Sequence, residues 1–388
     1  MPARRLGGHP ETQENNNVAA LRQRPRTNTS TIYMGGRSMK AKAVETLLLM
    51  EPSKENPRNS EGAMIELKDG RLSLGYSRFT GGGADNSAAQ IALRIADHDG
   101  RGWSGDKLLI GQEGVENVMS LSLLRLQSGE ILVLYLIKNG WDDCRPYVRV
   151  SSDEMETAGE KRLAVADKGY FVVNNDRLVQ LASGRLIIPA ALHNCTDGTV
   201  KTWDHRGVAM CYVSDDNGRT WRRSKGVLEA PAESRSGLQE PGVVERRDGR
   251  LMMWMRTDMR CQYQSFSRDG GETWSRAEPS PMMSPVSPAT IKRMPWTGDL
   301  LLVWNDHSGK HVFPPGRRTP LCTAYSTDDG RTWKNSKILE GYPDGWYCYI
   351  SMTFVDEHAV LSYCAGDSKV GGLNRLKAVA VHKDWIYA

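Results

Sequence analysis

Three arginines, two carboxylates and a tyrosine lie beside the ends of short apolar segments in this chain. They are Arg58, Asp85, Glu240, Arg256, Arg318 and Tyr349. A guanidinium group binds a planar carboxylate through two parallel hydrogen bonds, so several arginines around one cavity suit an anionic sugar. An ion pair within a loop is the ordinary explanation for any one of these residues. It is their joint placement that indicates a binding site.

The elements expected to position these residues are six β-hairpins. Each has two stretches of alternating apolar residues around a short turn, and the hairpins span 63–76, 121–136, 178–191, 242–255, 291–304 and 352–363. In an antiparallel meander, the start of the first strand, the end of the second and the start of the third share one edge. We predict that the same edge brings Arg78, Asp176, Arg177 and His193 to the substrate.

A second repeat is the octet Ser-x-Asp-x-Gly-x-Thr-Trp, with copies at 214–221, 267–274 and 326–333 and degenerate copies at 96–103 and 151–158. A period of about 50 residues is typical of propeller blades or solenoid turns. We therefore predict an all-β chain, a six-bladed β-propeller with Asp-box repeats over 39–388. The last blade lacks the octet, and we expect its strand near 378–382 to pair with an N-terminal strand near 43–49, which removes exposed sheet edges.

Composition narrows the class of partner. Residues 1–38 are polar and rich in Asn, Arg and Thr, so we expect them to be disordered; Met34 and Met39 leave open a later natural start. Nearly all the net charge of +5 lies in this region, and the balanced remainder gives little reason to expect nucleic acid or membrane insertion. Seven cysteines without C-x-x-C spacing predict neither a disulfide framework nor a zinc site. Without a recognisable signal peptide, we expect a cytoplasmic protein.

Two stretches carry a resemblance to a known family. The segment Gln239-Glu-Pro-Gly-Val-Val-Glu-Arg-Arg-Asp-Gly-Arg-Leu-Met-Met-Trp-Met-Arg256 and the segment Arg318-Thr-Pro-Leu-Cys-Thr-Ala-Tyr-Ser326 resemble the sialidase (neuraminidase) family, which are six-bladed Asp-box propellers. The resemblance covers roughly residues 45–385. It implies that Glu240 is the base for the nucleophile and that Arg256 and Arg318 bind the substrate carboxylate. Arg58 is the best match for the third arginine, although Asn59-Ser60 follows it where the family usually has Ile-Pro.

The resemblance also implies the remaining catalytic residues. Asp85, in a glycine-containing loop after the first hairpin, would be the acid/base, protonated by partial burial when the loop closes. Tyr349 would be the nucleophile, with Tyr347 as the alternative because the register of that strand is uncertain. A sialoside carries a carboxylate at its anomeric centre, so a neutral tyrosine suits the attack better than an anionic Asp or Glu. The expected outcome is removal of a terminal sialic acid with net retention, without a metal or cofactor.

Other functions stay open at this point. Segments around 142–146, 174–177 and 192–194 have no clear counterpart in the sialidase pattern, so the substrate could be a related acidic sugar in a sialoglycoconjugate or another glycan. A transglycosylase and a lyase using His193 or His307 are further enzyme alternatives. A noncatalytic carbohydrate-binding propeller is the alternative outside enzymes, because such a module needs the arginines but not Asp85, Glu240 and Tyr349.

Overall fold

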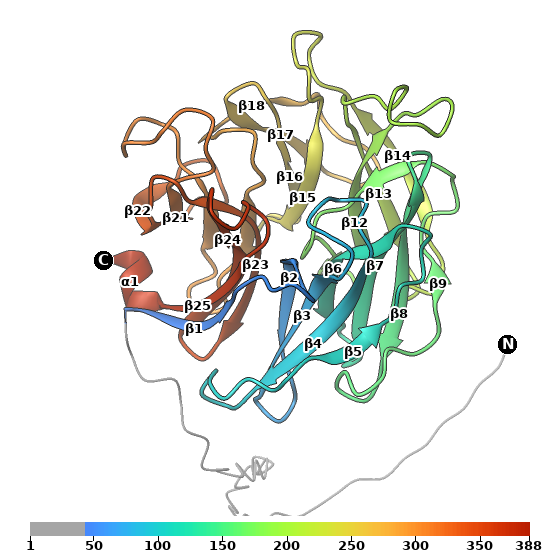
Figure 1. The fold of residues 1–388 in the computed structure, drawn as a ribbon. Helices are drawn as coiled ribbons and strands as arrows, with labels where there is room; N and C mark the ends of the chain where they lie inside the picture. The colour runs from blue at the N-terminus through green and yellow to red at the C-terminus, as the bar shows by residue number, and fades with distance from the viewer. Residues whose placement is uncertain (1–42) are drawn as a thin grey trace, which may run out of the picture. The chain divides into compact units, whose positions relative to one another are not determined.

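Six antiparallel blades follow one another along residues 43–388, the part of the chain that the computed structural model describes (Figure 1). The predicted disorder over 1–38 lies outside these residues. The all-β prediction is confirmed, because helix α1 (Lys383–Tyr387) is the one α-helix among the described elements. Blade one contains β2 (Arg58–Glu66), β3 (Leu72–Phe79), β4 (Ala89–Ala96) and β5 (Lys107–Ile110), and blade two contains β6 (Asn117–Arg125), β7 (Ile131–Gly140), β8 (Asp143–Ser151) and β9 (Arg162–Leu163).

The other blades repeat this meander. Blade three contains β11 (Val179–Gln180), β12 (Leu186–His193), β13 (Val208–Ser214) and β14 (Arg222–Leu228), and blade four contains β15 (Gln239–Glu245), β16 (Leu251–Arg256), β17 (Cys261–Ser267) and β18 (Glu278–Met283). Blade five contains β19 (Thr290–Arg293), β20 (Leu300–Asn305), β21 (Leu321–Ser326) and β22 (Lys334–Glu340). Strand β10 (Tyr170–Val172) joins blades two and three into one sheet, since Tyr170 pairs in parallel with Cys144 and antiparallel with His193.

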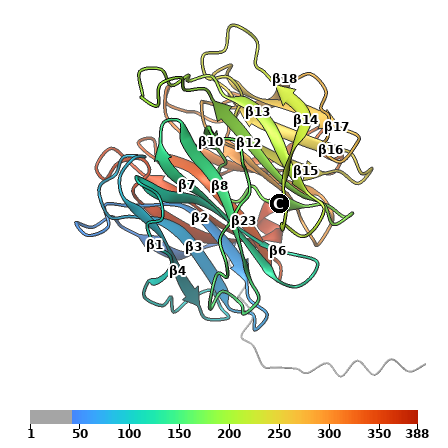
Figure 2. The ribbon, with the colours of Figure 1, turned by 90° about the vertical axis from the view of Figure 1, so that its right-hand side faces the viewer.

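Blade six is completed by the other end of the described chain. It contains β23 (Trp346–Val355), β24 (His358–Gly366), β25 (Leu376–His382) and β1 (Val44–Met50). Val44 pairs with Val381 and Met50 with Leu376, so the predicted closing pair is confirmed. The ring then closes through contacts between the innermost strands β2 and β23. Figure 2 shows the same blades turned by 90°.

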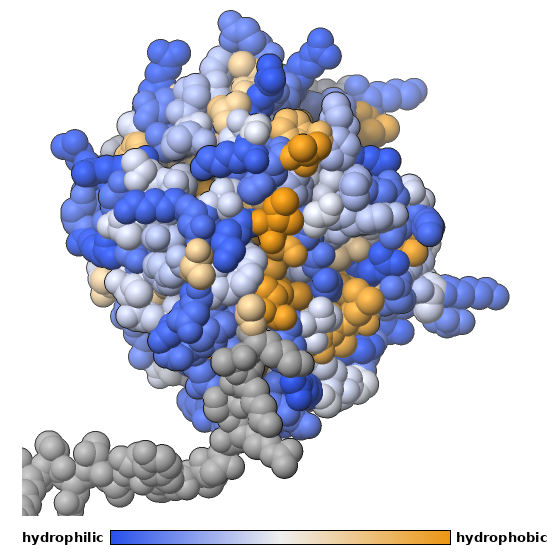
Figure 3. Space-filling model, turned by 90° about the vertical axis from the view of Figure 1, so that its left-hand side faces the viewer, coloured by the Kyte–Doolittle hydropathy of each residue, from blue (hydrophilic) through white to orange (hydrophobic). Residues whose placement is uncertain are grey.

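The core is divided among the blade interfaces. Each of six buried apolar clusters draws its side chains from two neighbouring blades, and one of them, containing Met64, Leu74 and Val360, joins blade six to blade one. Burial of apolar surface on both faces of every blade is the main stabilising term of such a ring. Figure 3 shows a mostly hydrophilic outer face crossed by a narrow strip of apolar side chains. None of the described helices is long and apolar enough to cross a membrane.

The octets form identical turns that hold the outer ends of the blades. In the turn at 267–274, the Asp269 carboxylate accepts hydrogen bonds from the backbone N–H and the hydroxyl of Thr273, at 2.9 and 2.5 Å. The Ser267 hydroxyl accepts from Gly271 N–H, and Trp274 donates to the Gly271 carbonyl. The copies at 214–221 and 326–333 repeat the Ser and Asp contacts. The repeated Ser, Asp and Thr side chains hydrogen-bond within their own turn, so the octets are structural.

Candidate active site

A repeated backbone irregularity turns selected side chains toward the middle of the ring. Five residues near the starts of the innermost strands, or just before them, adopt a left-handed backbone with φ between 48° and 58°: Glu61, Ser120, Asp176, Glu240 and Tyr349. In four of the five, a β-bulge lies at the same point. A non-glycine residue in this conformation costs about 1–3 kcal/mol, and bulges of this kind re-aim side chains next to active sites.

These strands surround a cavity of about 670 Å³. Six of the predicted site residues line it: Asp85, His193, Glu240, Arg256, Arg318 and Tyr349. Apolar and aromatic side chains from blades two and three form another part of the lining: Met119, Leu136, Tyr170, Phe171, Val172 and Trp203. The cavity therefore combines a charged wall with an apolar wall, as is usual for sites that bind small polar molecules.

A tyrosine and a glutamate form the central pair of this cavity. The Tyr349 hydroxyl donates a hydrogen bond to Glu240 Oε1 at 3.2 Å, and Arg256 Nη1 donates to the same oxygen at 2.8 Å. Burial works to raise the pKa of Glu240, but the charges of Arg256 and Arg318 outweigh it and hold this pKa below its usual range. Burial, and then the Glu240 charge, raise the pKa of Tyr349 well above its usual value. The pair is therefore a neutral phenol beside an ionised carboxylate, as required of a nucleophile that needs a base.

The predicted acid lies across the cavity in the loop after β3. Asp85 forms an ion pair with Arg58 at 2.5 Å, and the other Arg58 terminal nitrogen binds Glu61 at 3.0 Å. Partial burial works to raise the pKa of Asp85, but the Arg58 charge outweighs it and lowers this pKa. In this state the Asp85 side chain is 61% exposed and paired with a cation, which favours its ionised form; protonation of Asp85 when the loop closes stays a prediction. Asn117 and Lys138 hold the loop by donating to the Asp85 carbonyl.

Two of the arginines have free hydrogen-bonding capacity. Arg318 Nε and Nη1 and Arg256 Nε are buried without a hydrogen-bond partner. The Arg318 guanidinium lies over the rings of Trp346 and Tyr349, at 5.2 and 5.7 Å from their centroids. A buried donor left without a partner costs about 1–3 kcal/mol, and more when it is charged. This cost makes the arginine side of the cavity suited to an incoming anion.

Comparison with known proteins identifies the family of this propeller. A model of the BNR repeat-like domain family matches residues 75–361, which is most of the chain. The chain belongs to this family. A sialidase from Micromonospora viridifaciens is 30% identical over 163 residues, a match that covers 36% of this chain and 23% of that protein. The chain thus matches less than a quarter of the length of this curated relative.

Solved structures show the same architecture. A Hadza microbial sialidase superposes with a TM-score of 0.69 at 17% identity, covering 86% of this chain and 67% of that one. The Trypanosoma rangeli sialidase in complex with 2,3-difluorosialic acid superposes with a TM-score of 0.65 at 16% identity, covering 88% of this chain and 59% of that one. At such low identities the likeness is one of fold, and it confirms the prediction of a sialidase-type β-propeller.

Four residues predicted to contact substrate lie outside the cavity lining of this BNR repeat-like protein: Arg58, Arg78, Asp176 and Arg177. Arg58 is buried against Glu61 and Asp85, which do line the cavity. Arg78 forms an ion pair with Asp106 on the outer part of blade one, at 3.3 Å. Arg177 is buried and donates to the Ala289 carbonyl at 2.7 Å. Asp176 binds Lys292 at 2.7 Å and accepts from a backbone N–H of β23. Arg177 and Asp176 therefore tie blade three to blades five and six, and their placement as substrate contacts was wrong.

Backbone geometry distinguishes Tyr349 from Tyr347, the two tyrosines considered as the nucleophile. In a regular strand, Tyr347 and Tyr349 would point to the same face, because side chains alternate with a period of two. The bulge between Cys348 and Ser351 changes this relation. Tyr347 packs in the core against Tyr363, with ring centroids 6.3 Å apart, while Tyr349 lines the cavity.

Some residues of the site had no predicted role. Glu61 is buried against Arg58 and accepts from the Ser120 hydroxyl at 2.7 Å, which fixes the arginine. Its spacing of three residues from Arg58, on the same predicted strand edge, was the signal available in the sequence. Trp203 stacks on His193 with centroids 4.7 Å apart and comes from the loop between β12 and β13. No local pattern distinguished this tryptophan from the core tryptophans.

Proposed function

We propose that this protein is a retaining, exo-sialidase-like glycoside hydrolase that removes a terminal sialic acid or a related acidic sugar from glycoconjugates. The observation that carries the proposal is the Tyr349 hydroxyl hydrogen-bonded to the Glu240 carboxylate, beside buried guanidinium nitrogens of Arg256 and Arg318 that have no hydrogen-bond partner. A binding module needs the arginines alone. The half-buried tyrosine and the buried carboxylate, both held in strained bulges, support a nucleophile and its base.

The first half of the proposed reaction forms a covalent intermediate. The substrate carboxylate binds Arg58, Arg256 and Arg318. The Tyr349 oxygen attacks the anomeric carbon while its proton passes to Glu240. The bond from the anomeric carbon to the leaving oxygen breaks, and that oxygen takes a proton from Asp85. A neutral tyrosine suits this step, because an anionic nucleophile would be repelled by the substrate carboxylate.

The second half restores the enzyme. Asp85 removes a proton from water, and the resulting hydroxide attacks the anomeric carbon. The bond to Tyr349 breaks, and the phenolate takes its proton back from Glu240. Two displacements at one carbon give net retention of configuration.

Substrate binding also supplies the proton state that Asp85 needs. In the free protein Arg58 holds the Asp85 carboxylate at 2.5 Å, which favours its ionised form. A substrate carboxylate that takes over Arg58 removes this stabilisation and adds a neighbouring negative charge, and both changes raise the pKa of Asp85. The acid is thereby prepared by the arrival of the substrate.

The test uses 4-methylumbelliferyl sialic acid with the wild type, Tyr349→Phe and Asp85→Ala, and with Tyr347→Phe as the matched control. We expect release of the fluorophore by the wild type and by Tyr347→Phe, and a loss of about 10³-fold or more in Tyr349→Phe. Incubation with 2,3-difluorosialic acid, followed by intact mass measurement, should label the wild type but not Tyr349→Phe. Equal activity of Tyr349→Phe and the wild type would exclude the mechanism.

A second candidate is a hydrolase for another acidic sugar. The observation that favours it is the aromatic part of the cavity wall, Tyr170, His193 and Trp203. Trp141, outside the lining, stacks on Tyr170 with centroids 5.7 Å apart and supports this wall. Aromatic faces pack against the apolar faces of sugars, so this wall selects the group next to the acidic centre. An inactive wild type on sialosides, together with activity on a uronic or other nonulosonic acid glycoside, would favour this candidate.

A further inference from the structure

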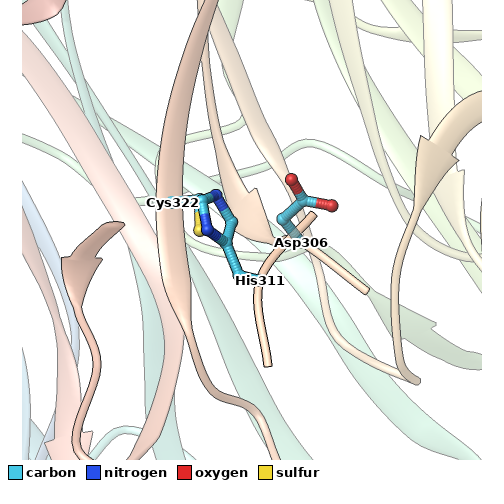
Figure 4. A group of neighbouring side chains, drawn as sticks. All are labelled: Asp306, His311 and Cys322. Carbon is cyan, nitrogen blue, oxygen red and sulfur yellow. The ribbon is translucent and has the colours of Figure 1, made fainter. Parts of the chain in front are cut away.

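A group of potential metal ligands lies in blade five, outside the cavity described above. Asp306 follows β20, His311 lies in the loop that leads to β21, and Cys322 lies on β21. Figure 4 shows these three side chains together. Their ligand atoms, an oxygen, an imidazole nitrogen and a sulfur, all lie within 4.8 Å of one another. The sequence did not predict this group, because its members are not arranged in a metal-binding spacing.

The burial of the Asp306 carboxyl group, without a basic partner in the described part of the chain, is a second, independent observation. Its side chain is 1% exposed, and among the described residues no lysine or arginine forms an ion pair with it. Its carboxylate oxygens accept only from the Ser308 N–H, at 2.9 Å, and from the Ser336 hydroxyl, at 2.6 Å. Buried charges in proteins are paired or coordinate metals. Asp306 therefore lacks a cationic partner of its own within the chain.

We propose that Asp306, His311 and Cys322 bind a zinc ion. Thiolate, imidazole and carboxylate are the three ligand types that zinc takes, and four-coordinate sites are the usual structural geometry. Ligand atoms around tetrahedral zinc lie roughly 3.3–3.8 Å apart for bonds of about 2.0–2.3 Å, so binding requires the separations between the ligand atoms to shorten by at most about 1.5 Å. The Ser336 hydroxyl, 3.1 Å from His311 Nε2, or a water completes the fourth position. Binding replaces the thiol proton of Cys322, which is released to solvent.

The place of the group in the chain gives the ion a structural role. Its ligands come from the beginning, the middle and just beyond the end of the loop between β20 and β21. The same loop carries Arg317 and Arg318, which line the cavity. A bound ion would hold this loop on the blade and so limit the motion of Arg318. The inference does not depend on the proposed glycosidase activity.

The experiment measures zinc content and affinity in the full chain. The protein is stripped with a chelator, dialysed against micromolar zinc, and measured by mass spectrometry of the metal, with affinity from competition with a chromophoric chelator. We expect one zinc per chain in the wild type and binding at least about tenfold weaker in Cys322→Ala and His311→Ala. Cys211→Ala, at another buried cysteine of a blade, is the matched control and should keep wild-type affinity.

Two further measurements separate loss of zinc binding from loss of folding. Cobalt substitution of the wild type should give a thiolate-to-cobalt charge-transfer band in the near ultraviolet, which reports Cys322 directly even if its alanine variant does not fold. Circular dichroism checks that His311→Ala is folded. Absence of zinc from the dialysed wild type, or unchanged zinc affinity in folded His311→Ala, would overturn the proposal.

Discussion

Replacing Glu240 by glutamine tests the proposed base most directly, because the change removes one charge and keeps the shape. The Tyr349 hydroxyl lies 3.2 Å from Glu240 Oε1, and the raised pKa of this tyrosine keeps it protonated at neutral pH. Without the carboxylate, no group accepts its proton during attack. General base catalysis contributes about 10²–10⁴-fold in rate. We therefore expect kcat to fall by that factor, equivalent to about 3–5 kcal/mol of transition-state stabilisation.

The assay separates this effect from a loss of binding. Glu240→Gln leaves Arg58 and Arg318 in place, so KM should change less than kcat. Glu245→Gln, on the same strand β15, is the matched control, because Glu245 contacts the backbone N–H of Ala182 away from the cavity. The activity of Glu240→Gln should also rise with pH, as hydroxide takes over deprotonation of the tyrosine. A variant that keeps a third or more of the wild-type kcat would refute the role of Glu240 as base.

Three further predictions concern substrate binding, the turns and pH. Arg318→Lys should raise KM for a sialoside by about tenfold or more, through loss of the bidentate fork, whereas Arg78→Lys should leave it unchanged in the same steady-state assay. Asp269→Ala removes the three hydrogen bonds that this carboxylate accepts in its turn and should lower the free energy of unfolding by about 1–3 kcal/mol in urea titration; an unchanged midpoint would contradict the structural role of the octet. The hydrogen bond from Arg125 is the largest influence that lowers the pKa of Glu154, to about 2. Because this pKa is depressed on folding, its stabilisation is present above about pH 4.5 and is lost as the pH falls toward 2, so the acid-induced loss of stability should shrink in Glu154→Gln.

The blades were predictable because their signals are local. Each hairpin is marked by alternating apolar residues around a turn, and each octet contains every group that its turn needs. The pairing of β1 with β25 was also predictable, because the sixth blade lacked one strand. Glu240, Arg256 and Arg318 could be placed because each lies a fixed number of residues from a hairpin or an octet.

The bulges could not be predicted, and they decide which side chains face the cavity. A left-handed residue at Asp176 or Tyr349 carries no sequence signal of the kind that glycine gives. A strand edge drawn without the left-handed residue at Asp176 placed Arg177 at the substrate, whereas the structure buries it against the Ala289 carbonyl. Arg78 was misplaced for a different reason: it finds Asp106, a partner beyond the next strand of its own blade, which no local spacing reveals.

The closing pair of strands has a consequence for how the protein is made. Strand β1 leaves the ribosome early, but its partner β25 is synthesised about 330 residues later, roughly 17–66 s afterwards at about 5–20 residues per second. Until β25 is made, the apolar side chains that pack between blades six and one stay exposed to solvent. The cavity cannot form before blade six is made either, because Arg58 comes from blade one and Tyr349 from blade six. Nascent chains released early would therefore expose a long apolar edge and would depend on chaperones until the ring is complete.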